Sequence, residues 1–99
     1  MSLIIEVNLS PVFQGALQSP NVLVELGEDE STVKGLLHRL ARESGGKIDS
    51  LLFEGGDSIL PGLMVMVNNR VFTGNALNKQ VIPLQDRDKV SLLYFVSGG

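Results

Sequence analysis

The feature that most limits the fold is one amphipathic helix pattern in the middle of the chain. Its apolar residues recur at intervals of three and four positions, which places them on one face of a helix. These residues are Val33, Leu36, Leu37, Leu40 and Ala41. Ser31 or Thr32 can cap the start, and the pair Gly45-Gly46 predicts the end. A helix with one apolar face has to bury that face against another layer.

The rest of the chain supplies that layer as strands. Five segments carry strand patterns: residues 3–9, 21–26, 63–67, 70–72 and 89–96. The run at 63–67 is continuously apolar, which predicts an interior strand with Met64 and Met66 filling the core. Asn68-Asn69 predicts a tight hairpin turn. The order strand–strand–helix–strand–short strand–strand predicts an α+β fold, with one helix packed on one face of a mixed sheet.

Two segments lack a clear period. Residues 10–20 contain Pro11, Gly15 and Pro20, so we expect a long loop there. Residues 47–62 predict a short helical turn followed by a loop rich in glycine and proline. Neither segment has the composition of a linker, and no internal repeat appears. We therefore expect residues 1–99 to form a single domain.

Composition excludes several classes of function. The net charge is −3, whereas a nucleic-acid-binding protein would carry a clustered basic face. The chain has no cysteine, which rules out disulfides, thiolate catalysis and cysteine-ligated metals. No apolar run approaches the roughly 20 residues that cross a bilayer, and the first residues lack the basic region of a secretion signal. We expect a cytoplasmic protein with neither nucleic acid nor membrane as a partner.

The polar residues form no catalytic constellation. The single histidine, His38, has no second ligand or nucleophile in a recognisable pattern, so we expect it at the surface. Asp49, Glu54 and Asp57 lack the regular spacing of a calcium loop. We therefore expect no metal site and no catalysis by this chain alone.

The chain closes on Gly98-Gly99 directly after an apolar run. Glycine has no Cβ and tolerates close approach by a partner, so such an end can enter a narrow active site. Residues 97–99, expected to be a flexible tail, would reach roughly 10 Å beyond the last strand. The alternative is an ordinary frayed terminus.

Three stretches together carry a resemblance to a known family: residues 65–70, residues 83–92 and the end, 96–99. In this ordered set the chain resembles the ubiquitin-like sulfur carriers (MoaD/ThiS-like), which include the small subunit of molybdopterin synthase and the thiamine-pathway carrier. The resemblance implies a β-grasp fold with a central C-terminal strand. It also implies that an E1-like adenylyltransferase uses ATP to activate the Gly99 carboxylate. A sulfur donor such as a cysteine desulfurase or a rhodanese then converts it to a thiocarboxylate.

The resemblance also implies a role for each residue near the end. Gly99 would be the site of adenylation and of the thiocarboxylate, and Gly98 would give access. Partner contacts would come from the last strand and its flanking turn, at Arg87, Leu93, Phe95, Val96 and Ser97. The chain itself would bind no cofactor, since ATP belongs to the activating enzyme.

The resemblance leaves several pathways open. Molybdenum cofactor synthesis is favoured, with a larger molybdopterin synthase subunit receiving the tail. The alternatives are thiamine, cysteine or tRNA thiolation, a ubiquitin-like modifier, or a non-catalytic β-grasp interaction module.

Two departures from the family pattern bear on the structure. Arg87 stands where the family usually has glycine in a late turn, so either the turn geometry differs or Arg87 adopts an uncommon backbone conformation. Tyr94-Phe95 stand where two prolines are common in the molybdopterin synthase subunit. In the last strand, Leu93 and Phe95 alternate with Leu92 and Tyr94, and either set can lie under the helix. If Leu93 and Phe95 face outward, they form an exposed apolar patch.

Overall fold

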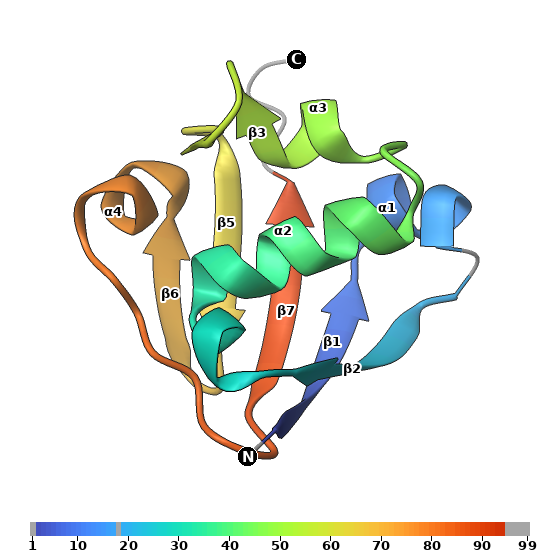
Figure 1. Cartoon of the computed structure of the whole chain (residues 1–99). Helices are drawn as coiled ribbons and strands as arrows, with labels where there is room; N and C mark the ends of the chain where they lie inside the picture. Colours follow the sequence, from blue (N-terminus) through green and yellow to red (C-terminus); the bar gives the residue numbers. More distant parts are fainter. Residues whose placement is uncertain (1, 18, 95–99) are drawn as a thin grey trace.

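The computed structural model describes residues 2–17 and 19–94, and its main layer is a five-stranded mixed sheet (Figure 1). The strands are β1 (Leu3–Leu9), β2 (Asn21–Leu26), β5 (Leu63–Val67), β6 (Arg70–Thr73) and β7 (Lys89–Tyr94). Their order across the sheet is β2-β1-β7-β5-β6. β7 pairs in parallel with β1 and antiparallel with β5. The predicted mixed sheet with a central C-terminal strand is confirmed, and so is the interior position of residues 63–67.

Helix α2 (Val33–Glu43) crosses one face of this sheet (Figure 1). The Thr32 hydroxyl accepts a hydrogen bond from Gly35 N at 3.0 Å and so caps the start, after the short 3-10 helix η1 (Glu28–Glu30). The predicted apolar stripe is fully or almost fully buried: Val33, Leu36, Leu37, Leu40 and Ala41. Alternate residues of the central strands meet it from the sheet: Ile5, Val7, Val65, Val90 and Leu92. The core therefore forms where one face of the helix, with a period of 3.6 residues, packs against alternate residues of the strands, with a period of two.

The loop expected at residues 10–20 is wrong, because the structure has helix α1 (Pro11–Leu17) there. Pro11 is at the first helical position, where its missing N–H costs nothing. Phe13 is fully buried, and the Gln14 side chain donates to Leu9 O at 2.9 Å. Pro11 thus begins a helix, whereas the sequence analysis predicts that it interrupts regular structure.

Helix α4 (Gly74–Lys79) was also not predicted. The Thr73 hydroxyl caps it by accepting from Ala76 N at 3.2 Å. Gly74 is required because a Cβ there would collide with the Leu60 carbonyl. A short helix that begins on a packed glycine carries little propensity signal.

In residues 47–62 the expected helical turn is confirmed as α3 (Asp49–Leu52), but the expected loop is wrong. β3 (Phe53–Glu54) pairs with β4 (Ser58–Ile59) in a small separate hairpin. Its turn contains Gly55 and Gly56 at φ of 67° and 100°, values that L side chains rarely adopt. The hairpin is thus a defined element whose turn depends on glycine.

Side chains fasten this hairpin to two helices. Asp57 pairs with Lys34 Nζ at 2.9 Å and with His38 Nε2 at 2.7 Å, both on α2. The side chain of Asn78, on α4, donates to Ile59 O and accepts from Ile59 N, each at 2.8 Å. These contacts fix the hairpin against the body of the protein. Hydrogen bonds from Lys34 and then from His38 hold the pKa of the Asp57 carboxyl below its ordinary value.

The turn before β7 fixes the start of that strand. Arg87 has φ of 71°, the uncommon conformation that was one of the two alternatives, and its N–H donates to Ile4 O at 2.8 Å. Asp86 Oδ1 accepts from Ile4 N at 2.9 Å. Asp88 accepts from Gln85 N at 2.8 Å through Oδ2. Carboxylates therefore close the turn and join it to β1.

Asn68 joins the same turn to β5. Its φ of 55° confirms the predicted hairpin conformation. Its N–H donates to Lys89 O at 2.7 Å, and its Oδ1 accepts from Lys89 N at 3.0 Å. Its Nδ2 donates to Asp88 Oδ1 at 3.0 Å. The register of β7 is thus set from both neighbouring strands.

We expect Arg87→Gly to raise the free energy of unfolding by about 0.5–1 kcal/mol. A left-handed conformation costs a non-glycine residue roughly 1–2 kcal/mol, and the greater freedom of glycine in the unfolded chain offsets part of the gain. The Arg87 side chain is 90% exposed, so its loss removes little packing. Urea unfolding of both proteins measures the difference. Arg87→Ala is the control, since it keeps the strain; equal stability of the Ala and Gly variants would contradict the prediction.

The Asp57 carboxyl should titrate with a midpoint below 3.8, its ordinary value. Because the pKa is lowered in the folded protein, the pairing stabilises the fold above that value and is lost as the pH falls through the folded pKa. Carboxyl chemical shifts followed by NMR against pH measure the midpoint. Lys34→Ala should raise it more than His38→Ala does. A midpoint that neither variant moves would rule out this network.

Candidate functional site

The described part of the predicted site is the end of β7. Tyr94, the last described residue, pairs with Leu63 of β5. Phe95, Val96, Ser97, Gly98 and Gly99 lie outside the described residues, and so does the flexible tail expected at 97–99. The structure therefore shows what leads to the tail.

The strand that leads to the tail is firmly held. Val90 and Leu92 are fully buried beneath α2, and strands flank β7 on both sides. The Ser10 N–H, just before α1, donates to Leu92 O at 3.2 Å. β7 cannot shift without breaking these contacts, so the end of the chain starts from a fixed point.

The other residues of β7 define the outer face, the side of the sheet that α2 does not cover. Leu92 faces the helix, which settles the alternative left open by the sequence: Ser91 and Leu93 face outward. Leu93 is 40% exposed. Leu93 thus takes the outward one of the two positions left open, while Phe95, its neighbour in the patch that this alternative implies, is outside the described residues.

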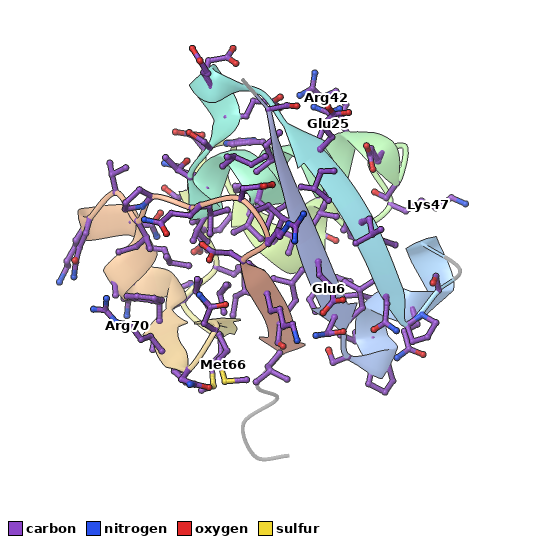
Figure 2. The ribbon with its side chains drawn as sticks, turned by 90° about the horizontal axis from the view of Figure 1, so that it is seen from below. Glu6, Glu25, Arg42, Lys47, Met66 and Arg70 are labelled. Carbon is purple, nitrogen blue, oxygen red and sulfur yellow. The ribbon has the colours of Figure 1, made fainter. Side chains whose placement is uncertain are left out.

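Leu93 belongs to a larger apolar surface on the outer face, which we call the outer patch. It consists of Met64, Met66, Val71 and Leu93. Met64 pairs with Leu93, and Met66 pairs with Ser91 on one side and Val71 on the other. Val71 is 52% exposed. In Figure 2, which views the molecule from below, Met66 points away from the side that α2 covers.

The core role expected for Met64 and Met66 is wrong, because both are half-buried on this face. Their neighbours Leu63, Val65 and Val67 carry the core contacts. When every residue of a strand is apolar, the sequence does not show which alternate residues face the core and which face outward. One sequence feature does indicate the outer face: Met64 and Met66 occupy alternate positions of the strand. Methionine is flexible and suits surfaces that adapt to partners.

The outer face changes character along β7. At the start of the strand, Glu6 lies opposite Lys89. Near its end, the outer patch presents apolar side chains. A partner that approaches the tail would therefore meet the apolar end of this face first.

The structure does not bring Arg87 to the tail. Arg87 precedes β7, whereas Leu93 is near its end, and six residues of extended chain span roughly 20 Å. Its side chain extends into solvent beside Asp86, with 4.0 Å between the charged atoms. A partner contact at Arg87 stays a prediction, at a position remote from the outer patch.

Other chemistry finds little support in the described residues. No three His, Asp or Glu side chains within residues 2–17 and 19–94 gather closely enough to hold a metal ion. None of the helices in the same ranges is long and apolar enough to cross a membrane. His38 is partly exposed, as expected, but it also stacks on Phe53 with ring centres 4.3 Å apart.

Comparison with known proteins identifies the family. The model of the ThiS family matches residues 18–99. No curated protein matches the chain. Among solved structures, SAMP1 from Haloferax volcanii aligns with a TM-score of 0.77 and 22% identity over 100% of both chains.

Two further structures have the same fold. A Pyrococcus furiosus protein described as molybdopterin converting factor subunit 1 gives a TM-score of 0.70 and 20% identity, over 95% of this chain and 99% of that one. Urm1 from Trypanosoma brucei gives 0.69 and 19%, over 99% and 97%. The sheet with a central β7 is thus the β-grasp arrangement, and the chain belongs to the ThiS family of ubiquitin-like sulfur carriers.

Proposed function

We propose that this protein carries sulfur on the carboxyl group of Gly99. The observation that supports this most is that the family match extends through residue 99, where two glycines follow the central strand. A tail that ends in two residues without side chains and follows a fixed strand suits insertion into the active site of another protein. The chain is then a substrate and a carrier, and partner enzymes perform the catalysis.

The chemistry follows from the properties of a carboxyl group. A terminal carboxyl with a pKa of about 3.3–3.7 is ionised at neutral pH and is a poor electrophile. In the proposed first step, a Gly99 carboxylate oxygen attacks the α-phosphate of ATP on the E1-like enzyme, and pyrophosphate leaves. In the second, the outer sulfur of a persulfide on a cysteine desulfurase or a rhodanese attacks the carbonyl carbon and AMP leaves, which gives an acyl disulfide. In the third, a thiol of the partner enzyme attacks the donor's own sulfur in that disulfide, so that an enzyme disulfide forms and the thiocarboxylate is released. The product is a thiocarboxylate, which needs no cysteine on this chain.

The outer patch is the surface that we assign to partner recognition in this reaction. It is apolar and partly exposed, and it lies at the end of the sheet from which the tail continues. Exposed apolar surfaces of this kind mark protein contacts. An enzyme that holds Gly99 would cover Leu93 and the two methionines.

For the pathway we favour molybdenum cofactor synthesis, in which a larger molybdopterin synthase subunit would receive the thiocarboxylate. The likeness to the Pyrococcus furiosus converting factor subunit supports this assignment. A second function is favoured by the likeness to SAMP1, whose name is small archaeal modifier protein 1. As a modifier, the activated Gly99 would acylate a lysine amine in place of accepting sulfur.

Intact mass after co-expression with the cognate E1-like enzyme and a sulfur donor tests the carrier function. The expected product is heavier by the replacement of one oxygen with sulfur, and deletion of Gly99 should abolish the change. A modifier would instead appear as an amide-linked adduct on other proteins. An unchanged mass in the presence of ATP and a working donor would refute the carrier function.

Leu93→Ser should raise the KM of the adenylating enzyme for this protein about tenfold, because a central apolar contact of an interface contributes this much. The maximal rate should stay nearly the same, since Gly99 is untouched. ATP–pyrophosphate exchange measures both constants. Leu23→Ser is the matched control: Leu23 is 71% exposed, on the edge strand β2. Equal effects of the two substitutions would contradict a specific role for the outer patch.

A further inference from the structure

A groove runs beside α2, on the side of the molecule opposite the outer patch. It is made of two adjoining hollows of about 330 and 370 Å³. Both hollows are lined by His38 and Ala41 of α2 and by Asp49 at the start of α3. Phe53 closes one end, and Arg42 borders the other. Three elements therefore contribute to one continuous depression.

Asp49 contributes a carboxylate to this groove. Basic side chains of α2 are engaged elsewhere: Lys34 pairs with Asp57, and Arg42 pairs with Glu30 at 3.2 Å. The His38 ring also contacts Asp57, through Nε2. Within residues 2–17 and 19–94, the exposed carboxylate of Asp49 forms no ion pair. The groove thus offers an unpaired negative charge.

A pair of stacked rings, His38 and Phe53, lines the same hollow as Asp49. The His38 ring stacks on Phe53 with an angle of 18° between the ring planes. Phe53 is buried, and the His38 side chain is 43% exposed. A guanidinium group fits this combination, since it stacks on flat rings and forms paired hydrogen bonds with a carboxylate.

The groove lies at the end of the molecule where β7 finishes. α3 and the β3–β4 hairpin stand at the end of the sheet where β7 finishes (Figure 1). Leu60, which follows the hairpin, donates to Leu52 O at 3.0 Å, and Leu63 begins the strand that pairs with Tyr94. An enzyme that encloses the tail would extend over this end and reach both sides of the sheet.

We propose that the groove receives an arginine side chain of the enzyme that adenylates Gly99, with Asp49 as its counter-ion and His38 as the stacking surface. This inference rests on the proposed function. It adds a polar contact on the α2 side to the apolar contact of the outer patch. The tethers of Asp57 and Asn78 hold the neighbouring hairpin, so the groove is formed before the enzyme binds.

Kinetics of adenylation with Asp49→Asn test the proposal. Removing the charge should raise the KM for the carrier about five- to tenfold, with an unchanged maximal rate, because the contact serves binding alone. The wild-type KM should rise with salt more steeply than the KM of the variant, since the salt-sensitive pair is then missing. ATP–pyrophosphate exchange at two salt concentrations gives both results.

Matched variants separate this contact from general effects. Asp29→Asn removes the same charge from η1, which precedes α2, whereas Asp49 follows the helix; it should leave the KM unchanged. Asp49→Glu should retain most of the affinity. Thermal unfolding of each variant shows whether the fold is intact.

The outcomes distinguish failure of the arginine contact from failure of the carrier function. If the enzyme activates the wild-type protein and Asp49→Asn has the wild-type KM and salt dependence, the arginine contact is refuted and the carrier function stands. If the wild-type protein is not activated at all, the carrier function fails and this inference fails with it.

Discussion

The burial of Val90 and Leu92 beneath α2 is the contact on which the rest of the structure depends. Both side chains are fully buried, and they belong to the strand that lies between β1 and β5. These side chains give the helix its contact with the central strand, and the backbone of the same strand joins the two halves of the sheet. The last strand in the chain is therefore the middle of the fold. The C-terminal group that we propose to carry sulfur therefore follows a strand that is paired on both sides and buried under the helix.

This arrangement makes the register of β7 decisive. A shift by one residue would place Ser91 and Leu93 beneath the helix and expose Val90 and Leu92, because successive side chains alternate between faces. Asn68 and Asp88 oppose such a shift through hydrogen bonds to the first residue of β7 and to its neighbours. Arg87 has a left-handed conformation within the turn that these hydrogen bonds close. Its strain is explained by the geometry of the turn and requires no role in partner binding.

The sequence predicted the elements that have a clear period and missed those that depend on tertiary contacts. The α2 stripe and the main strands were predictable because burial on one face imposes spacings of 3.6 and 2 residues. α1 was missed because Pro11 both interrupts regular structure and starts helices. The outer patch was hidden because residues 63–67 are apolar on both faces. The groove was not predictable, since folding brings His38, Asp49 and Phe53 together from a helix, a short helix and a hairpin.

In the proposed function, the reacting group lies on two glycines, so recognition of this protein has to come from side chains outside them. Two glycines present the same backbone to every enzyme, so they cannot tell one pathway from another. Differences must then be read from side chains near the end of β7. The outer patch offers flexible apolar groups that adapt to more than one partner. A charged groove beside a tethered hairpin imposes direction and charge, which favour one partner over others. Segment 47–62, which supplies Asp49 and Phe53 to this groove, is therefore where specificity would be built without altering Gly99.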